Sequence, residues 1–240
     1  MEETFIAVKN RRRRKQKVAE TNPVSLQLTK IESCKLDLQE SAFYADLLAS
    51  LSQCNFTSIV SYGIGSPSSC PIARHQFALL LLLNNQYNVR ECSLYDPAFS
   101  CLDKELILHY DLTLIFCNEE GKRRVREKTL FYMPHCGKLL YDNVLRANWS
   151  SIKNVIVIGN RFSSYKERLT TKRFRAEAPC VEKLNELLEE IEIKNSFKYE
   201  DIFNDLAIHW TKELNLPPPP PEAQIDPECD EIVFATKTDY

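Results

Sequence analysis

The predicted fold of this chain is organised around residues Ser58–Leu83, SIVSYGIGSPSSCPIARHQFALLLLL. Its first five residues predict a buried strand, and the Gly63-Ile64-Gly65-Ser66 turn then leads into an apolar helix. Pro71 suits the first turn of that helix, where no backbone donor is needed. We expect Ser68 or Ser69 to cap the helix, because a serine oxygen accepts hydrogen bonds from the free N–H groups of the first turn.

The run Leu79–Leu83 is apolar on every side, which predicts a helix that protein covers all round. A strand, a Gly-x-Gly turn and a helix often present backbone N–H groups to a phosphate or a carboxylate. The full dinucleotide fingerprint also needs a third glycine, where this chain has Ser68, and a nearer acidic residue than Asp96. The alternative is a tight turn that packs the helix and binds nothing.

Composition places the chain among globular proteins. It has 240 residues, of which 44% are hydrophobic, enough for one α/β domain with extensions. Nine cysteines without a C-x-x-C pair, in a chain with no apolar leader, predict reduced thiols and argue against a structural zinc site. Because the net charge is −2 and residues 1–22 carry +4, the remainder carries −6 and is no nucleic-acid-binding surface by composition.

Three regions are expected. Residues 1–22 predict a disordered basic tail, whose run Lys9–Lys17 is a nuclear localisation signal, a nucleic-acid contact or simply a solvated tail. Residues 23–214 predict a single α/β domain. Residues 215–240 predict a proline-rich C-terminal tail that begins with a stiff polyproline segment, Pro217–Pro221.

Hydrophobic patterns predict the remaining elements of the domain. Helices are expected within Ser25–Leu51 and at Leu102–His109, Lys138–Ala147 and Val181–Glu190, and further strands at Val89–Tyr95, Leu112–Phe116, Thr129–Met133, Asn154–Ile158, Ile191–Lys194 and Leu206–Trp210. Asn154–Ile158 is typical of a parallel strand, and Ile191–Lys194 is expected to be the last one. The alternation predicts a three-layer Rossmann-like domain, a mostly parallel sheet with helices on both faces.

In such sheets, ligands bind outside the carboxyl ends of the strands. Four of the five glycines, at positions 63, 65, 137 and 159, fall at or just past these ends, where a backbone turns sharply or approaches something closely. We therefore expect a pocket for a small anionic or nucleotide ligand, with a purely structural rim as the alternative. The expected ligand-binding residues are Gly63, Gly65, Ser66, Asp96, His135 and Asn160.

Two residues are candidates for chemistry. His135 is the candidate general acid or base, since imidazole titrates near neutral pH, and the alternative is a hydrogen-bonded residue at a strand end. Its neighbour Cys136 points the opposite way on extended backbone, so the two make a poor nucleophile–base pair. Cys70, at a helix N-terminus, has its thiolate favoured by the helix dipole, and Cys70-Pro71 is similar to a short element of some haem-responsive proteins. The sequence specifies no cofactor and no other metal site.

Several stretches resemble the SRR-type family, which is named for the plant "sensitivity to red light reduced" protein. They are YGIGSPSSCPIARHQFALLLLL at 62–83, YDP at 95–97, LFYMPHCGKLLYDNVLRAN at 130–148, VIVIGNRFSSY at 155–165 and the basic opening NRRRRKQK at 10–17. The resemblance covers the chain from about Ala7 to Trp210 and leaves out the proline-rich tail.

The resemblance implies a regulatory protein of the cytoplasm and nucleus with protein partners, associated with circadian-clock input and light signalling. Animal relatives in this family are associated with clock-gene expression and haem biosynthesis. The family implies no catalytic residues. Three hypotheses therefore follow: a non-enzymatic regulator, a Rossmann-like methyltransferase or nucleotide-dependent enzyme that uses the rim from Gly63 to Asn160, and a haem-responsive regulator with Cys70 or His135 as iron ligand.

Overall fold

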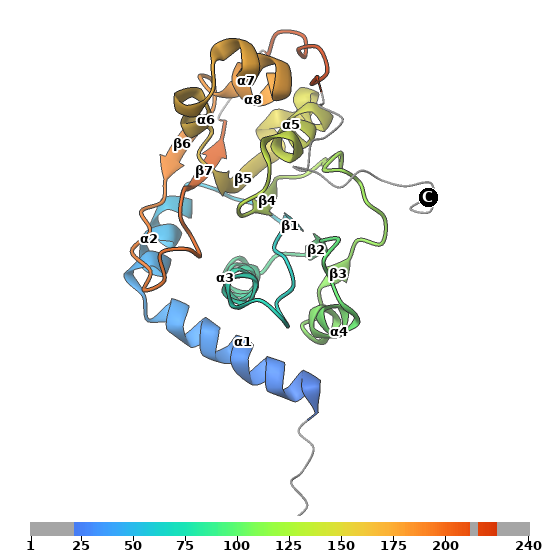
Figure 1. Ribbon diagram of the computed structural model, residues 1–240, viewed down its shortest axis with the longest axis vertical. Helices are drawn as coiled ribbons and strands as arrows, with labels where there is room; N and C mark the ends of the chain where they lie inside the picture. The colour runs from blue at the N-terminus through green and yellow to red at the C-terminus, as the bar shows by residue number, and fades with distance from the viewer. Residues whose placement is uncertain (1–21, 212–215, 225–240) are drawn as a thin grey trace, which may run out of the picture.

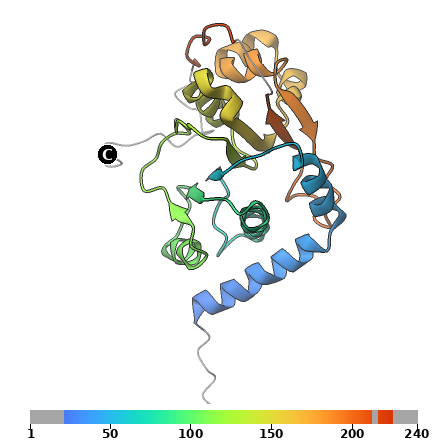
Figure 2. The same ribbon diagram turned by 180° about the vertical axis from the view of Figure 1, so that it is seen from behind.

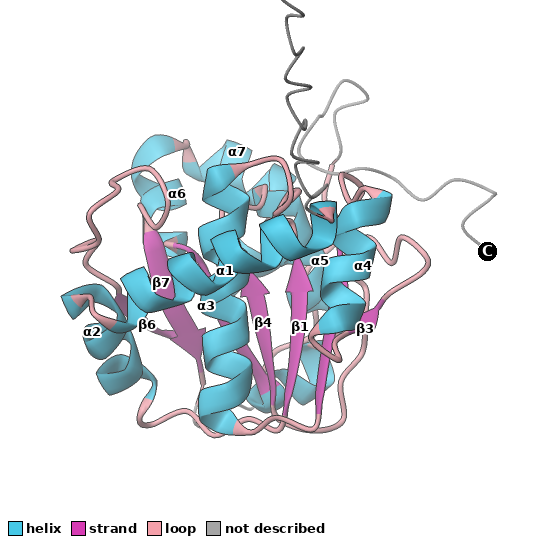
Figure 3. Ribbon diagram, turned by 90° about the horizontal axis from the view of Figure 1, so that it is seen from below, coloured by secondary structure: helices cyan, strands magenta, loops and turns pink. Residues whose placement is uncertain are grey.

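The strand that opens the quoted stretch lies inside a seven-stranded sheet of order β3-β2-β1-β4-β5-β7-β6, drawn in Figure 1. The computed structural model describes residues 22–211 and 216–224. β1 (Ser58–Tyr62) pairs in parallel with β2 (Glu91–Tyr95) and β4 (Thr129–Met133). Figure 3 shows the arrows of β1 and β4 pointing to the same edge of the sheet, so their carboxyl ends lie together.

The predicted mostly parallel sheet is confirmed, and its last two strands are the exception. β3 (Thr113–Leu114) and β5 (Val155–Asn160) continue the parallel part, whereas β7 (Leu206–Trp210) pairs antiparallel with β5 and with β6 (Glu189–Glu192). The prediction that Ile191–Lys194 is a last parallel strand was therefore wrong. β6 and β7 are joined by a loop that contains no helix, and such a connection returns the chain antiparallel.

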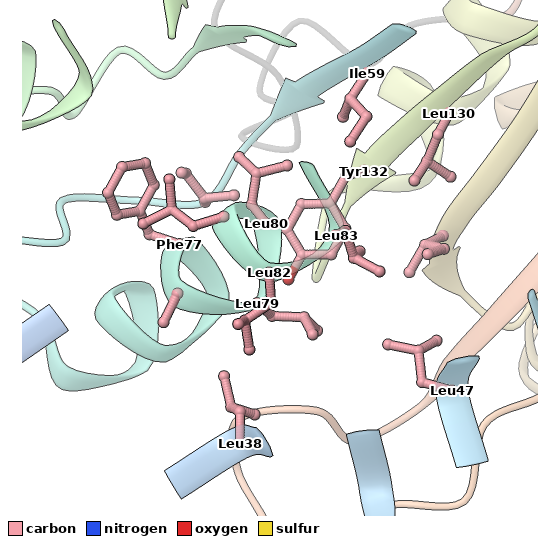
Figure 4. Close-up of a cluster of buried hydrophobic side chains, with 14 of the residues drawn as sticks. Leu38, Leu47, Ile59, Phe77, Leu79, Leu80, Leu82, Leu83, Leu130 and Tyr132 are labelled. Carbon is pink, nitrogen blue, oxygen red and sulfur yellow. The ribbon is translucent and has the colours of Figure 1, made fainter. Parts of the chain in front are cut away.

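One face of the sheet is covered by the first half of the chain. Its helices are α1 (Pro23–Gln39), α2 (Ala42–Leu51), α3 (Pro71–Tyr87) and α4 (Cys101–His109). α3 lies between the sheet and α1, as Figures 2 and 3 show, and every residue from His75 to Leu83 is buried. Figure 4 shows its leucines among side chains of β1, β4, α1 and α2. The helix predicted to be covered on all sides is thus confirmed.

The opposite face is covered over β4 and β5 by the second half of the chain, which completes three layers. α5 (Lys138–Ala147), α6 (Phe162–Arg168), α7 (Thr171–Glu177), α8 (Pro179–Leu184) and the 3-10 turn η1 (Trp149–Asn154) pack there. The helix predicted at Val181–Glu190 was placed too late, because α8 starts at Pro179 and ends at Leu184, and Glu189 and Glu190 belong to β6.

Two local predictions also fail. Leu112–Phe116 is not a buried strand: β3 keeps only two residues at the sheet edge, and Phe116 is 91% exposed. No serine caps α3, since its N-cap is Cys70 and no side chain caps it. The preceding turn explains this, because the N–H groups of Ser69 and Cys70 both point back to the carbonyl of Ser66.

Between β3 and β4 the chain crosses the α5 side of the sheet without forming a helix, over residues 115–128. Figure 1 shows this crossover as a long loop beyond β1 and β2, on the side away from α3 and α4. We call it the basic crossover, because residues 122–128 hold five basic residues and one acidic residue.

The described part of the C-terminal region, residues 216–224, lies along α5, η1 and α7. The indole nitrogen of Trp149 donates to the carbonyl of Pro217 at 2.9 Å, and Arg146 donates to the carbonyls of Pro220 and Pro221. Residues 1–21 of the predicted basic tail, with its localisation signal, lie outside the described residues, whereas Asn22 caps α1. The predicted domain boundaries stay predictions.

Candidate functional site

The turn after β1 depends on two glycines in the left-handed region of backbone space. Gly63 has a φ of +70° and Gly65 a φ of +72°, values that cost other residues energy. A Cβ at Gly63 would lie 2.5 Å from Sγ of Cys136, whereas one at Gly65 would make ordinary contact with Ala73. Close packing of the ends of β1 and β4 therefore requires Gly63.

Asp96 reaches this turn from the end of β2. Its Oδ2 accepts a hydrogen bond from the N–H of Gly65 at 2.7 Å, and its Oδ1 accepts one from the N–H of Ala98 at 2.8 Å. Asp96 is buried. The backbone donor that a bound phosphate would use at Gly65 is therefore already paired with a carboxylate of the chain itself.

A second carboxylate, Asp103 of α4, holds the rest of the turn and is fully buried. It accepts from the hydroxyl of Ser66 at 2.7 Å, from the N–H of Ser68 at 2.8 Å, and from the N–H and hydroxyl of Ser100 at 2.9 and 2.7 Å. Burial alone would raise the pKa of Asp103, but the bonds from Ser66, Ser100 and Ser68 outweigh it and hold that pKa below its usual value. Asp103 is thus a stable internal anion.

Charged side chains of the protein itself occupy the turn of the strand–turn–helix element. Besides the two carboxylates, the guanidinium of Arg74 donates to the carbonyls of Pro67 and Ser68 at 3.0 and 3.1 Å. A phosphate at this turn would have to displace Asp96 or Asp103 and would meet the negative charge of the other. The arrangement fits a rigid turn better than a phosphate cradle.

Asn160 and Tyr141 join the other half of the carboxyl edge. The amide of Asn160 donates to the carbonyl of Cys136 at 3.1 Å, and its backbone N–H donates to the hydroxyl of Tyr141 at 3.0 Å. That hydroxyl donates in turn to the carbonyl of Met133 at 2.6 Å. A Cβ at Gly159 would lie 2.5 Å from the ring of Tyr141, so here too a glycine admits the protein's own side chain.

His135 is exposed and follows β4 with a left-handed φ of +58°. Its Nε2 lies 3.0 Å from the carbonyl oxygen of Ile202, so this nitrogen carries the proton, since a carbonyl can only accept. The same carbonyl accepts from Nε2 of Gln76 at 3.1 Å. The imidazole thus ties the loop before β7 to the end of β4.

Cys136 is buried and its Sγ lies 3.4 Å from the carbonyl oxygen of Tyr62, to which it donates. Burial, and then the charge of Asp96, raise the pKa of the Cys136 thiol far above its usual value. The thiol therefore stays protonated near neutral pH. His135 and Cys136 bind different carbonyls and do not form a nucleophile–base pair. The extended backbone on which that expectation was based is wrong, because His135 lies in a turn with a left-handed φ.

The haem candidate Cys70 is half-buried at the start of α3. The eight cysteines within the described ranges are all free thiols. Those same ranges contain no cluster of three or more His, Cys, Asp and Glu side chains that could hold a metal ion. A haem ligand at Cys70 or His135 stays a prediction.

Several residues of the edge were missed by the sequence analysis. Tyr141 and Asp103 connect helices to strand ends far away in the chain, and no local pattern predicts those contacts. One signal was available: Ser100 and Asp103 have the spacing of a capping box, which α4 forms. This spacing identifies Asp103 as part of a helix cap, but it does not predict the hydrogen bond that Asp103 accepts from Ser66.

Comparison with protein families gives a match to the SRR1 domain over residues 26–210. The match runs from α1 to the end of β7 and so contains the whole sheet. This chain belongs to the SRR1 domain family. The resemblance predicted from the sequence is thereby confirmed.

Three relatives place the chain within this family. An SRR1-like protein of Mus musculus is 40% identical over 132 residues, 53% of either chain. An SRR1-like protein of Drosophila melanogaster is 29% identical over 188 residues, 75% of this chain and 66% of the relative. Protein SENSITIVITY TO RED LIGHT REDUCED 1 of Arabidopsis thaliana is 31% identical over 129 residues, 52% of this chain and 46% of the relative. The chain thus spans about half to two thirds of the length of these relatives.

Two of the cavities in the described residues lie away from the carboxyl edge. One, of about 410 Å³, lies among α6, α7 and α8, and includes Phe174 and Leu187. The other, of about 760 Å³, lies between β1, β2 and the basic crossover. The ligand pocket predicted at the edge stays a prediction.

Within the described residues, no helix is both long and apolar enough to span a bilayer.

Proposed function

We propose that this SRR1-domain protein is a non-enzymatic regulator of light and clock signalling that acts by binding other proteins. The Arabidopsis relative, whose name refers to reduced sensitivity to red light, supports the pathway. The pathway is carried over as a proposal, because the match covers only 46% of that relative.

The observation that supports a non-enzymatic role is the occupied turn. Asp96 and Asp103 accept from the N–H groups of Gly65 and Ser68, which a Rossmann-like enzyme would offer to its cofactor. The rim glycines at 63 and 159 face Cys136 and Tyr141 rather than open space. The edge that normally carries chemistry is instead used to join strands and helices.

A Rossmann-like methyltransferase or nucleotide-dependent enzyme is the second candidate, and one observation favours it. The Oδ1 atom of Asn160 is buried and has no hydrogen-bond partner within residues 22–211 and 216–224. Such an atom is one that a small anionic or nucleotide ligand with a donor group would satisfy.

A thermal-shift screen of the full chain separates the two candidates, because a ligand that binds only the folded state raises the melting midpoint. The screen uses ATP, GTP, S-adenosylmethionine, nicotinamide cofactors and haem. We expect no shift with the first four. A shift that is present in the wild type and lost in Asn160→Asp would overturn the non-enzymatic proposal. Gly65→Val is a poor probe, since its φ of +72° makes any side chain destabilising by itself.

A link to haem biosynthesis, with haem as an effector, belongs to the same proposal and rests on the family and on Cys70. Haem mixed with the protein should give a sharp Soret band that Cys70→Ala or His135→Ala changes. A broad band, identical in both variants, would indicate non-specific adsorption and contradict a haem site.

We further propose that the protein occupies both cytoplasm and nucleus, with the run Lys9–Lys17 as the nuclear signal. Replacing Arg11 to Arg14 by alanine should shift a tagged protein to the cytoplasm without changing its melting temperature. Unchanged localisation would remove this role of the basic run.

A further inference from the structure

The 760 Å³ cavity lies where a three-layer α/β domain usually has a helix. Parallel strands are usually connected by a helix that covers the sheet, but the connection from β3 to β4 has none. The floor of the cavity is formed by β1 and β2, with Val60 and Ser93 buried at its base. The missing helix thus leaves a groove, which we call the crossover groove.

The wall of the crossover groove holds more basic than acidic residues. Arg90, Lys122, Arg123, Arg124 and Arg126 line it, against Glu91, Glu119 and Glu127. This is unusual in a chain whose residues after the basic tail carry a net charge of −6. A local excess of guanidinium groups favours binding of carboxylates or phosphates, which they bind with two hydrogen bonds at once.

Part of this charge is neutralised internally. Arg123 donates to both oxygens of Glu119 at 2.8 and 2.9 Å, and Arg90 lies 3.6 Å from Glu127. Arg124 and Arg126, both exposed, have no side-chain hydrogen bond or ion pair to another described residue. These two guanidinium groups are the ones that a ligand would neutralise.

The basic crossover is held in place rather than loosely attached. Asn148, fully buried, accepts from the N–H of Val125 at 2.8 Å and donates to the carbonyl of Arg123 at 2.8 Å. Asn154 donates to the carbonyl of Arg126 at 2.9 Å. The backbone that carries the two unpaired arginines is therefore fixed from behind, which lowers the entropic cost of binding.

We propose that the crossover groove binds an acidic segment of a partner protein, with Arg124 and Arg126 pairing with its carboxylates. The same crossover carries Phe116, which lies outside the lining of the groove; its 91% exposure suits an apolar contact with a protein rather than with a small anion. The choice of a protein ligand rests on the proposed function, while the anionic chemistry rests on the groove alone.

Fluorescence anisotropy with a labelled ten-residue peptide of alternating glutamate and leucine tests this proposal. The full chain should bind it, and Arg124→Gln/Arg126→Gln should bind at least tenfold more weakly. Lys104→Gln/Lys172→Gln, which removes two exposed charges on α4 and α7, is the matched control and should bind as the wild type does. Binding should weaken with salt, because exposed charges are screened.

The basic tail needs its own control, since it also attracts acidic peptides. Replacing Arg11 to Arg14 by alanine should leave the tenfold effect of the groove variant intact. No binding, or equal binding by the groove and control variants, would overturn the proposal. Displacement of the peptide from the same two arginines by millimolar inorganic phosphate would also overturn the proposal, in favour of a small anion. Displacement by poly-uridylate would overturn it in favour of RNA. Each result can occur whether or not the thermal-shift screen finds a cofactor.

Discussion

The carboxyl edge of the sheet and the crossover groove treat their polar groups in opposite ways. At the edge, Gly65 and Ser68 donate to Asp96 and Asp103, and a cysteine and a tyrosine fill the space beside the glycines. In the groove, Arg124 and Arg126 have no side-chain partner among residues 22–211 and 216–224. The carboxyl edge has the residue types that are typical of a ligand site, but its donors are already paired. The groove has the unpaired charged groups that a ligand site needs.

Residue type alone therefore does not locate a binding site. In folded proteins almost every buried hydrogen-bond donor has a partner, and the free energy of that pairing stabilises the fold. A donor that is already paired inside the chain must give up its partner before it binds a ligand. An exposed and fixed guanidinium gives up only water, so the groove is better prepared for an anion.

Gly63→Ala, at the carboxyl edge, should destabilise the protein more than the other variants. The left-handed φ and the approach of Cβ to Sγ of Cys136 at 2.5 Å should together cost about 3 kcal/mol of unfolding free energy. Urea denaturation measures this loss. The double variant Gly63→Ala/Cys136→Ala should be less destabilised than the sum of the two single variants. If the losses of unfolding free energy of the two single variants added up to that of the double variant, there would be no steric conflict between residue 63 and Cys136.

Next is Asp103→Asn, which should cost about 2 kcal/mol at pH 7, because an amide places its NH2 against N–H donors. The pKa of Asp103 is held below its usual value, so its stabilisation is complete above the unfolded pKa of about 3.9 and is lost as pH falls through the folded pKa. The variant should therefore lose less stability than the wild type on acidification. Asp46→Asn, at an exposed position, is the control, and a similar loss in both variants would contradict a special role for Asp103.

The smallest expected effect is that of Arg124→Gln/Arg126→Gln on stability, within about 0.5 kcal/mol of zero, as for exposed residues without special contacts. The same variant is expected to lose peptide binding, so the groove would separate binding from stability. Calorimetry and anisotropy on one sample make the comparison. Destabilisation by more than about 1 kcal/mol would mean that these arginines hold the crossover in place.

Local patterns in the sequence determined much of this protein. The alternation of apolar runs predicted β1, β4, α5 and β7 with the bounds that the structure gives, because a buried strand or an amphipathic helix needs a particular spacing of apolar residues. The motifs from Tyr62 to Tyr165 identified the family, which the match over residues 26–210 confirms. Gly63 and Gly159 lie where a side chain approaches the backbone too closely for a Cβ, as predicted, whereas a Cβ at Gly65 would make only ordinary contact.

Tertiary structure decided what approaches those glycines. The pairing of Asp103 with Ser66 spans 37 residues and that of Asp96 with Gly65 spans 31, distances over which no periodicity carries information. The antiparallel end of the sheet depends on a loop with no helix in it, and the crossover groove exists because another connection also lacks one. The sequence specifies which residues are polar, but only packing decides whether each finds its partner inside the chain or outside it.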